Sequence, residues 1–156
     1  MLTNYSEQAL ERRWRKRFQS TNNRLLKTLA VIEIDEQGWS PDDGIQTIKD
    51  HLFVICEARR KLIGALSVGQ NGAALGARNR PISDFNSQAS FIETSARQIT
   101  NLLVSAEKSL AAIPEGLTNE LDDLAFECFE REVVSLAAIQ FLLRLIDPSR
   151  MMGTIG

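Results

Sequence analysis

Histidine is nearly absent from this chain, and its scarcity excludes most of the metal chemistry found in helical proteins. The 156 residues include one histidine, His51. A di-iron or di-manganese centre in a helical bundle needs a Glu-x-x-His motif on each of two helices. Zinc would need His51 to converge with Cys56 and Cys128 from two different helices. We therefore expect no catalytic residue, no metal site and no cofactor.

Cysteine is also scarce, and long hydrophobic runs are missing. Cys56 and Cys128 both lie inside apolar helical patterns, which favours buried free thiols in a reducing compartment. The most apolar stretch, residues 133–146, is interrupted by Ser135, Gln140 and Arg144 and is too short to cross a bilayer. No basic leader precedes an apolar core at the N-terminus, which predicts no signal peptide. A cytoplasmic protein without a membrane partner is expected.

No single sign of charge dominates, because the formal net charge is −2. A generic nucleic-acid-binding protein would usually be basic. The glycine-rich stretch 69–82 also lacks the Gly-Lys-Ser/Thr ending of a phosphate-binding loop. A nucleotide site there is not expected.

What the sequence does contain is helical periodicity, most regular over residues 83–113. The apolar positions there alternate in steps of four and three, the pattern of a long helix packed against other helices: Phe85, Ala89, Ile92, Ala96, Ile99, Leu103, Ala106, Leu110 and Ile113. Ser83 is the predicted N-cap. Pro114 is expected to end the helix.

Three further helices are predicted over residues 4–35, 41–68 and 118–146. The first carries Asn22 where its apolar stripe requires another hydrophobic residue, and Trp14 belongs to that stripe, so we expect it in the core. Ser40 followed by Pro41 and two aspartates is a start signal for the second helix. Arg59 and Glu132 interrupt the stripes of the second and fourth helices. They could form an ion pair, or each side chain could reach outward along its own stem.

These elements predict an all-α fold: an antiparallel, up-down-up-down four-helix bundle with one long glycine-rich connection between its second and third helices. Residues 1–147 would form a single domain, and residues 148–156 a flexible tail. If the helices alternate in direction, the charges separate toward opposite poles. The basic pole would bind an anionic partner through Arg12, Arg13, Arg15, Lys16, Arg17, Arg60, Lys61, Arg78 and Arg80. Acids on a neighbouring helix are the other explanation for the basic run 12–17.

The acidic residues of the fourth helix raise one enzymatic alternative. Glu127 and Glu130 lie about one turn apart and could share a magnesium ion, as in helical nucleotide pyrophosphohydrolases. The further carboxylates that such a site needs are scattered along the chain, so a solvated acidic face at a helix start is the preferred interpretation.

The function that follows is a non-enzymatic helical-bundle interaction protein, a scaffold, adaptor or regulatory subunit that binds another macromolecule and self-associates. The fourth helix is apolar around most of its C-terminal half, which is typical of a subunit contact or of a central core helix. The predicted interface comprises Phe53, Phe129, Phe141, Leu142 and Leu145. Phe53 could instead lie along a neighbouring helix. A nucleic-acid-associated protein that grips phosphates with the basic pole is the alternative.

Overall fold

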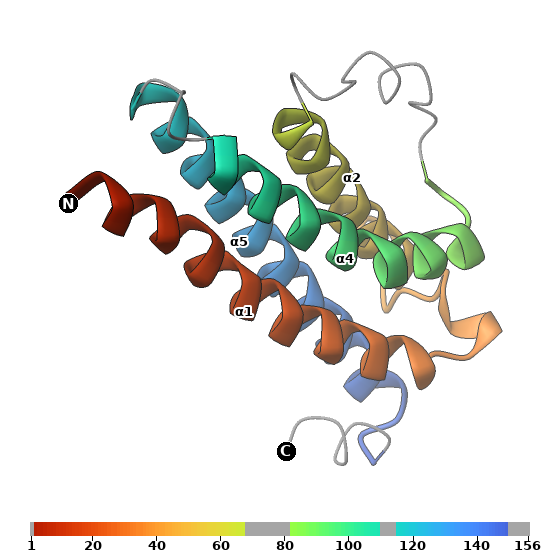
Figure 1. Ribbon diagram of the computed structural model, residues 1–156. Coiled ribbons are helices and arrows are strands. Elements are labelled where there is room, and N and C mark those ends of the chain that lie inside the picture. The colour runs from red at the N-terminus through yellow and green to blue at the C-terminus, as the bar shows by residue number, and fades with distance from the viewer. Residues whose placement is uncertain (1, 68–81, 110–114, 150–156) are drawn as a thin grey trace.

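The computed structural model describes the backbone of residues 2–67, 82–109 and 115–149, and the side chains of residues 14–67, 82–103 and 121–149. Throughout these ranges the regular structure is helical, with four α-helices, one short 3-10 helix and no strand. The helices pack against one another in a bundle (Figure 1). The all-α prediction is confirmed.

Helix α1 (Leu2–Ala30) runs unbroken through the polar stretch 20–23. It ends five residues before the predicted position, because the chain turns at Val31 and then forms the 3-10 helix η1 (Ile34–Glu36). The backbone N–H of Glu33 donates to Glu36 Oε1 at 2.8 Å. That carboxylate satisfies a backbone donor at the start of η1 and favours the turn over a continued helix.

Helix α2 (Ile48–Leu66) begins seven residues after the predicted start, so the signal at Ser40 and Pro41 was misread. Thr47 is the N-cap: its Oγ1 accepts from the N–H of Asp50 at 3.2 Å, and the Asp50 carboxylate accepts from the N–H of Thr47 at 2.9 Å. This reciprocal capping box satisfies two backbone donors. Gly44 adopts a φ of 94°, which a helix cannot contain, so residues 41–47 form turns before α2.

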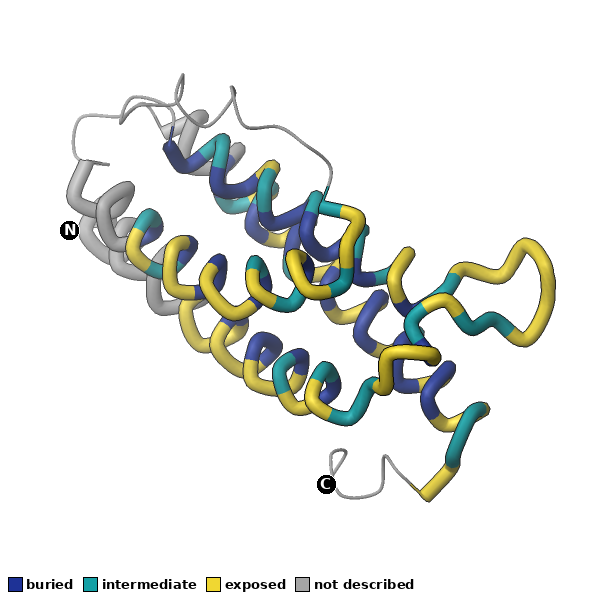
Figure 2. Tube along the Cα trace, turned by 90° about the vertical axis from the view of Figure 1, so that its right-hand side faces the viewer, coloured by how far each residue is buried: buried dark blue, intermediate teal, exposed yellow. Residues whose placement is uncertain are grey.

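Helix α4 (Phe85–Ser109) and helix α5 (Glu115–Ile146) complete the bundle. Asp84, and not the predicted Ser83, caps α4, because its Oδ2 accepts from the N–H of Ser87 at 3.1 Å. Within the part of the predicted seam whose side chains are described, the positions from Ile92 to Leu103 are buried. Ala106, Leu110, Ile113 and Pro114 lie outside the described side chains. Figure 2 shows buried positions facing the bundle interior and exposed positions facing out.

The direction of the helices differs from the prediction. One core cluster joins the early part of α1 (Trp14, Phe18) to the late part of α2, the late part of α4 and the early part of α5. A second cluster joins Leu25, late in α1, to the early part of α2, the early part of α4 and the late part of α5. Helices α2 and α4 therefore run parallel to each other, as do α1 and α5. The topology is up-down-down-up, and the predicted up-down-up-down order was wrong.

The long connection between α2 and α4 explains this topology. The side-chain amide of Gln88 donates to the backbone oxygens of Lys49 at 3.3 Å and Ile82 at 3.0 Å. Ile82 therefore lies beside the start of α2, whereas Ser67 lies at its end, about 26 Å away at 1.5 Å per helical residue. A chain segment of this length can return along the whole helix. The sequence interpretation wrongly required each helix to reverse direction.

Candidate interaction surface

Helix α5 has two apolar faces. Its inner face follows the predicted stripe, and each described member from Leu121 to Leu143 is buried in the bundle. On the opposite side of the same helix, five large hydrophobic residues are exposed: Phe126 (53%), Val133 (37%), Val134 (63%), Phe141 (59%) and Leu145 (48%). At 100° per residue these positions, with Ala137, fall within a sector about 120° wide. We call this sector the outer face of α5.

A groove beside the outer face separates α5 from α2. It has a volume of about 350 Å³ and is lined by Phe53, Val54, Leu62, Leu124 and Cys128, among others. Glu127 bridges its two walls: one carboxylate oxygen lies 3.6 Å from Lys61 Nζ and 3.3 Å from Arg131 Nη2. Phe53 is half-buried in this groove, so it joins the apolar surface of α5 to that of α2.

The predicted interface residues divide into three groups. Phe141 and Leu145 are exposed on the outer face. Phe129 is half-buried, and its ring packs 6.0 Å from that of Trp14 and 6.3 Å from that of Phe18. Leu142 is 3% exposed, so it belongs to the core and not to the surface. Its inclusion was an error, because Leu142 lies three residues after Ile139 and shares its side of the helix, which packs in the same core cluster.

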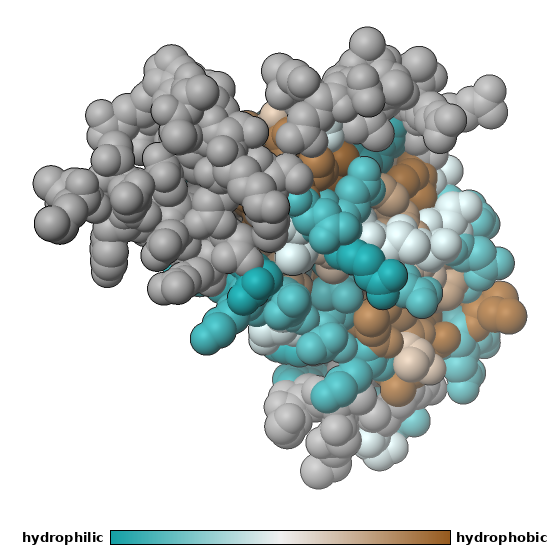
Figure 3. Space-filling model, viewed as in Figure 1, coloured by the Kyte–Doolittle hydropathy of each residue, from teal (hydrophilic) through white to brown (hydrophobic). Residues whose placement is uncertain are grey.

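The face of the bundle formed by α1 and the segment that follows it is less apolar. In Figure 3, hydrophilic atoms cover most of the described surface of α1, and apolar atoms gather near its end and around the segment that follows. Ile34 and Ile45 in that segment are exposed. They lie on turns and on a single short helix, whereas the outer face of α5 extends over more than five helical turns.

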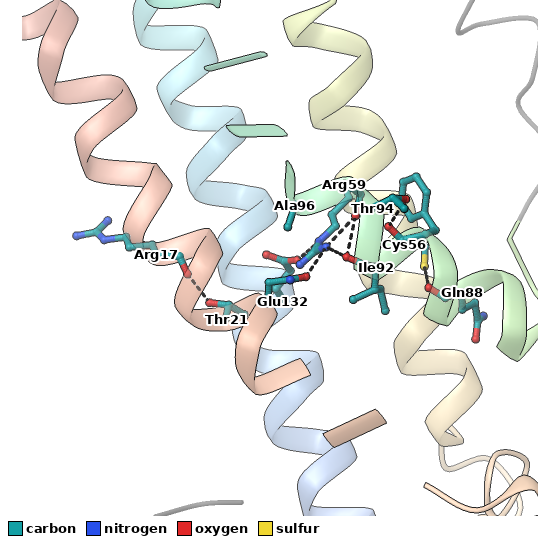
Figure 4. A network of polar contacts seen from close by, with 12 residues as sticks. Arg17, Thr21, Cys56, Arg59, Gln88, Ile92, Thr94, Ala96 and Glu132 are labelled. Carbon is teal, nitrogen blue, oxygen red and sulfur yellow. Dashed lines mark hydrogen bonds and ion pairs between the residues drawn. The ribbon is translucent and has the colours of Figure 1, made fainter. Parts of the chain in front are cut away.

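Of the two alternatives for Arg59 and Glu132, the structure has the ion pair: it lies at the centre of the bundle, and both side chains are fully buried. Arg59 Nε donates to Glu132 Oε1. Arg59 Nη1 lies 3.1 Å from Asn22 Oδ1, 2.8 Å from the backbone oxygen of Ile92 and 2.8 Å from Ser95 Oγ. These partners come from α1, α4 and α5, so one guanidinium joins all four helices (Figure 4).

The electrostatics of this network indicate a structural role. Burial raises the pKa of Glu132, and the adjacent Arg59 offsets part of that rise. Arg59 Nη2 and Glu132 Oε2 have no hydrogen-bond partner within the described residues, although they are the second donor and acceptor of a side-on guanidinium-carboxylate fork. A group without solvent access cannot reach a substrate. The network can instead fix the register of the helices, since any slip would leave a buried charge unpaired.

Three other described side chains, two cysteines and one histidine, have shifted pKa values. Burial raises the pKa of the Cys56 thiol to about 12 and also raises that of Cys128, and both cysteines are free, as expected. His51 is half-buried, and burial lowers its pKa. Among the described residues no three histidine, cysteine or acidic side chains are grouped to hold a metal. No described helix has the length and apolarity to cross a membrane.

The observed topology changes the predicted basic pole in part. The start of α1 and the end of α2 still lie at one end of the bundle, but the start of α5 lies there in place of the start of α4. Because α1 and α5 are parallel, the basic run at the start of α1 lies beside the acidic start of α5: Trp14 Nε1 donates to Asp122 Oδ1 at 2.7 Å. Trp14 is 1% exposed, which confirms its place in the core. Acids on a neighbouring helix, one of the two explanations offered for the basic run, are therefore present.

The predicted anion-binding residues have varied surroundings. Arg17 stacks over Trp14 at 5.1 Å and over Phe129 at 5.8 Å, Arg60 pairs with Glu57 at 2.8 Å, and Lys61 pairs with Glu127. Arg15 and Lys16 are exposed on α1. Arg12 and Arg13 are on α1, but their side chains lie outside the described set, and Arg78 and Arg80 lie outside the described residues altogether.

Two features were missed by the sequence interpretation. Asn22 was noted as a polar break in its stripe, which was the available signal that it could partner another polar break such as Arg59. Ser95 gave no such signal, because serine is common on both helix faces. The outer residues Phe126, Val133 and Val134 were hidden by the high apolar content of α5, in which the two faces are hard to separate.

Comparisons with protein-family models, curated proteins and solved structures find no match to this chain.

Proposed function

We propose that this protein is a non-enzymatic helical-bundle interaction protein, and that the outer face of α5 is its contact surface for another protein. The carrying observation is the stripe of exposed Phe126, Val133, Val134, Phe141 and Leu145 on one side of one helix. Scattered exposed apolar residues are normal, but a contiguous set is typical of a binding surface. The buried, free cysteines support a reducing compartment such as the cytoplasm.

The rigidity of α5 supports this proposal. Its inner face is held in the core along its length, and Glu132 ties it to Arg59 at mid-helix. A surface presented by a preordered helix loses little conformational entropy when a partner binds. The neighbouring groove with Phe53 would extend the contact toward α2.

The test compares proteins that co-purify with the wild-type chain and with the Val134→Lys/Phe141→Lys variant from the source cells. Both side chains are mostly exposed, so we expect the variant to fold and to lose the specific partners. The matched control places the same two charges on α4, with Ser90→Lys and Thr94→Lys. Identical partner sets for wild type and the α5 variant, with a differently tagged second copy of the chain counted among the partners, would contradict the proposal.

Nucleic-acid binding is the second proposal, and it depends on the exposed Arg15, Lys16 and Arg17 on α1. The acidic start of α5 beside them reduces the local positive potential. Retention on heparin that falls steeply with salt would support it. An absence of retention at low salt would exclude this alternative and leave the first proposal unaffected.

A further inference from the structure

The outer face of α5 has a charge pattern that is complementary to itself. Glu130 lies seven residues before Ala137, and Arg144 lies seven residues after it. A step of seven residues is close to two helical turns, so these three positions share one side of the helix. All three are exposed, and neither charged side chain forms an ion pair within the described part of the chain.

We propose that the partner on this face is a second copy of the chain, in a two-fold dimer whose two α5 helices run antiparallel and cross at Ala137. This inference deepens the proposed function and rests on it. In that arrangement Glu130 of each copy faces Arg144 of the other, so two ion pairs form by symmetry. A parallel pairing would set Glu130 against Glu130 and Arg144 against Arg144, and like charges would oppose it.

The apolar residues fit the same axis. Val133 lies four residues before Ala137 and Phe141 four residues after it, so each Phe141 ring would face the Val133 of the other copy. Ala137 at the crossing point has the smallest side chain on the outer face, which allows the two backbones to approach closely there. Its large neighbours flank the crossing and would fill the space on either side.

The small size of the surface indicates a weak, reversible contact. The stripe from Phe126 to Leu145 is about 30 Å long and about 12 Å wide, which gives a buried area of about 700 Å² over the two copies. Stable complexes bury about 1,200 to 2,000 Å². We therefore expect a reversible dimer that forms in the micromolar range, with its mass dependent on protein concentration.

Sedimentation equilibrium of the purified full chain tests the charge pairs. Glu130→Arg or Arg144→Glu alone creates two like-charge contacts and is expected to weaken dimerisation at least tenfold, whereas the double exchange restores it. Glu93→Arg and Arg97→Glu on α4 make the same charge changes on another exposed surface and serve as matched controls. A double exchange that associates no better than the single variants would overturn the antiparallel register.

A cysteine at the axis tests the geometry independently. Ala137→Cys is expected to give an inter-chain disulfide under mild oxidation, since residue 137 of one chain would face residue 137 of the other. The native thiols are buried and should not interfere. Glu93→Cys is the control: it should still dimerise through α5 but form no inter-chain disulfide. A wild-type chain that stays monomeric at millimolar concentration excludes the dimer. An outer face of α5 covered by residues 150–156 would give the same result. If the α5 variant of the co-purification test still loses partners, the proposed function stands while the dimer fails.

Discussion

The guanidinium of Arg59 makes the energetically most demanding set of contacts in the molecule. It is fully buried, and it depends on acceptors from three other helices. A well-packed apolar core could be as stable. What the polar network adds is a penalty for every arrangement in which the helices are displaced along their axes.

Replacing one partner of the Arg59–Glu132 ion pair should cost far more stability than replacing both. We expect Glu132→Leu to lower the free energy of unfolding by about 3 to 5 kcal/mol, because it leaves the charge of Arg59 buried without a counterion. Arg59→Met with Glu132→Leu should recover part of that loss. Urea denaturation measures both variants, and Glu132→Gln, which keeps an acceptor for Arg59, is the conservative control. A loss below about 0.5 kcal/mol for Glu132→Leu would show that the pair is dispensable.

The variant Arg59→Met should show a distinctive pH dependence. Burial already raises the pKa of Glu132, and without Arg59 nothing offsets that rise. The folded state would then hold the proton more tightly than the unfolded state does. Stability is therefore fully present below the unfolded pKa and is lost as the pH rises through the folded pKa. If the denaturation midpoint of Arg59→Met does not decrease relative to that of wild type as the pH is raised from 5 to 8, this expectation is contradicted.

The two thiols should be unreactive in the folded protein. Burial raises the pKa of Cys56 to about 12, and Cys128 is 2% exposed, so neither supplies an accessible thiolate at pH 8. We expect a chromogenic disulfide reagent to react slowly with the native chain and to titrate both thiols in urea. An added exposed thiol, Ser149→Cys, is the positive control. Rapid reaction of a native cysteine would mean that the local packing opens.

At the scale of the element, the starts of α2 and α4 depend on capping side chains. Thr47 and Asp50 cap α2 reciprocally, and Asp84 caps α4. Ser40 has the residue type of a cap, yet its hydroxyl donates to the backbone oxygens of Asp42 at 2.7 Å and Ile45 at 2.9 Å. It therefore stabilises a turn, and the helix begins later.

The location of the α2 start can be tested with two substitutions. Thr47→Ala should lower the free energy of unfolding by about 1 kcal/mol, because the N–H of Asp50 loses its acceptor. Ser40→Ala should cost less than about 0.5 kcal/mol, since its hydroxyl is exposed and serves only the preceding turn. Thermal or urea denaturation compares them. A larger loss at Ser40 than at Thr47 would contradict the observed helix boundary.

At the scale of the whole molecule, the connection between α2 and α4 decides the topology. The parallel arrangement of these helices requires the chain to return from Ser67 to Ile82, which lies beside Lys49 at the other end of α2. A tight turn would force an antiparallel neighbour instead. The length of this segment is therefore a structural requirement, whatever its amino-acid composition.

Shortening the connection should prevent the native fold. With residues 68–81 replaced by two glycines, Ser67 and Ile82 could be at most about 10 Å apart, against the roughly 26 Å that α2 imposes. We expect loss of the cooperative unfolding transition or formation of a domain-swapped dimer, observed by circular dichroism and light scattering. Insertion of ten Gly/Ser residues is the control and should cost less than about 1 kcal/mol. A stable, monomeric shortened chain would refute the parallel arrangement.

Much of the secondary structure and core was determined by the sequence alone. The spacing of apolar residues identified four helices and their buried stripes. The two polar breaks in those stripes, Arg59 and Glu132, left an ion pair and outward-reaching side chains as alternatives, and the structure has the ion pair. These features depend on residues close in sequence or on a side chain that burial forces to find a partner. The buried state of both cysteines followed from the same periodicity.

Only the tertiary structure decided how the helices are directed and which of their surfaces remain exposed. An apolar stripe states that a face is covered but carries no information about the direction of the covering helix, so parallel and antiparallel neighbours look alike in sequence. The long connection permits both. Once α1 and α5 lie parallel, the basic start of one lies beside the acidic start of the other. The second apolar face of α5 stays largely exposed because its neighbours pack mainly on the first.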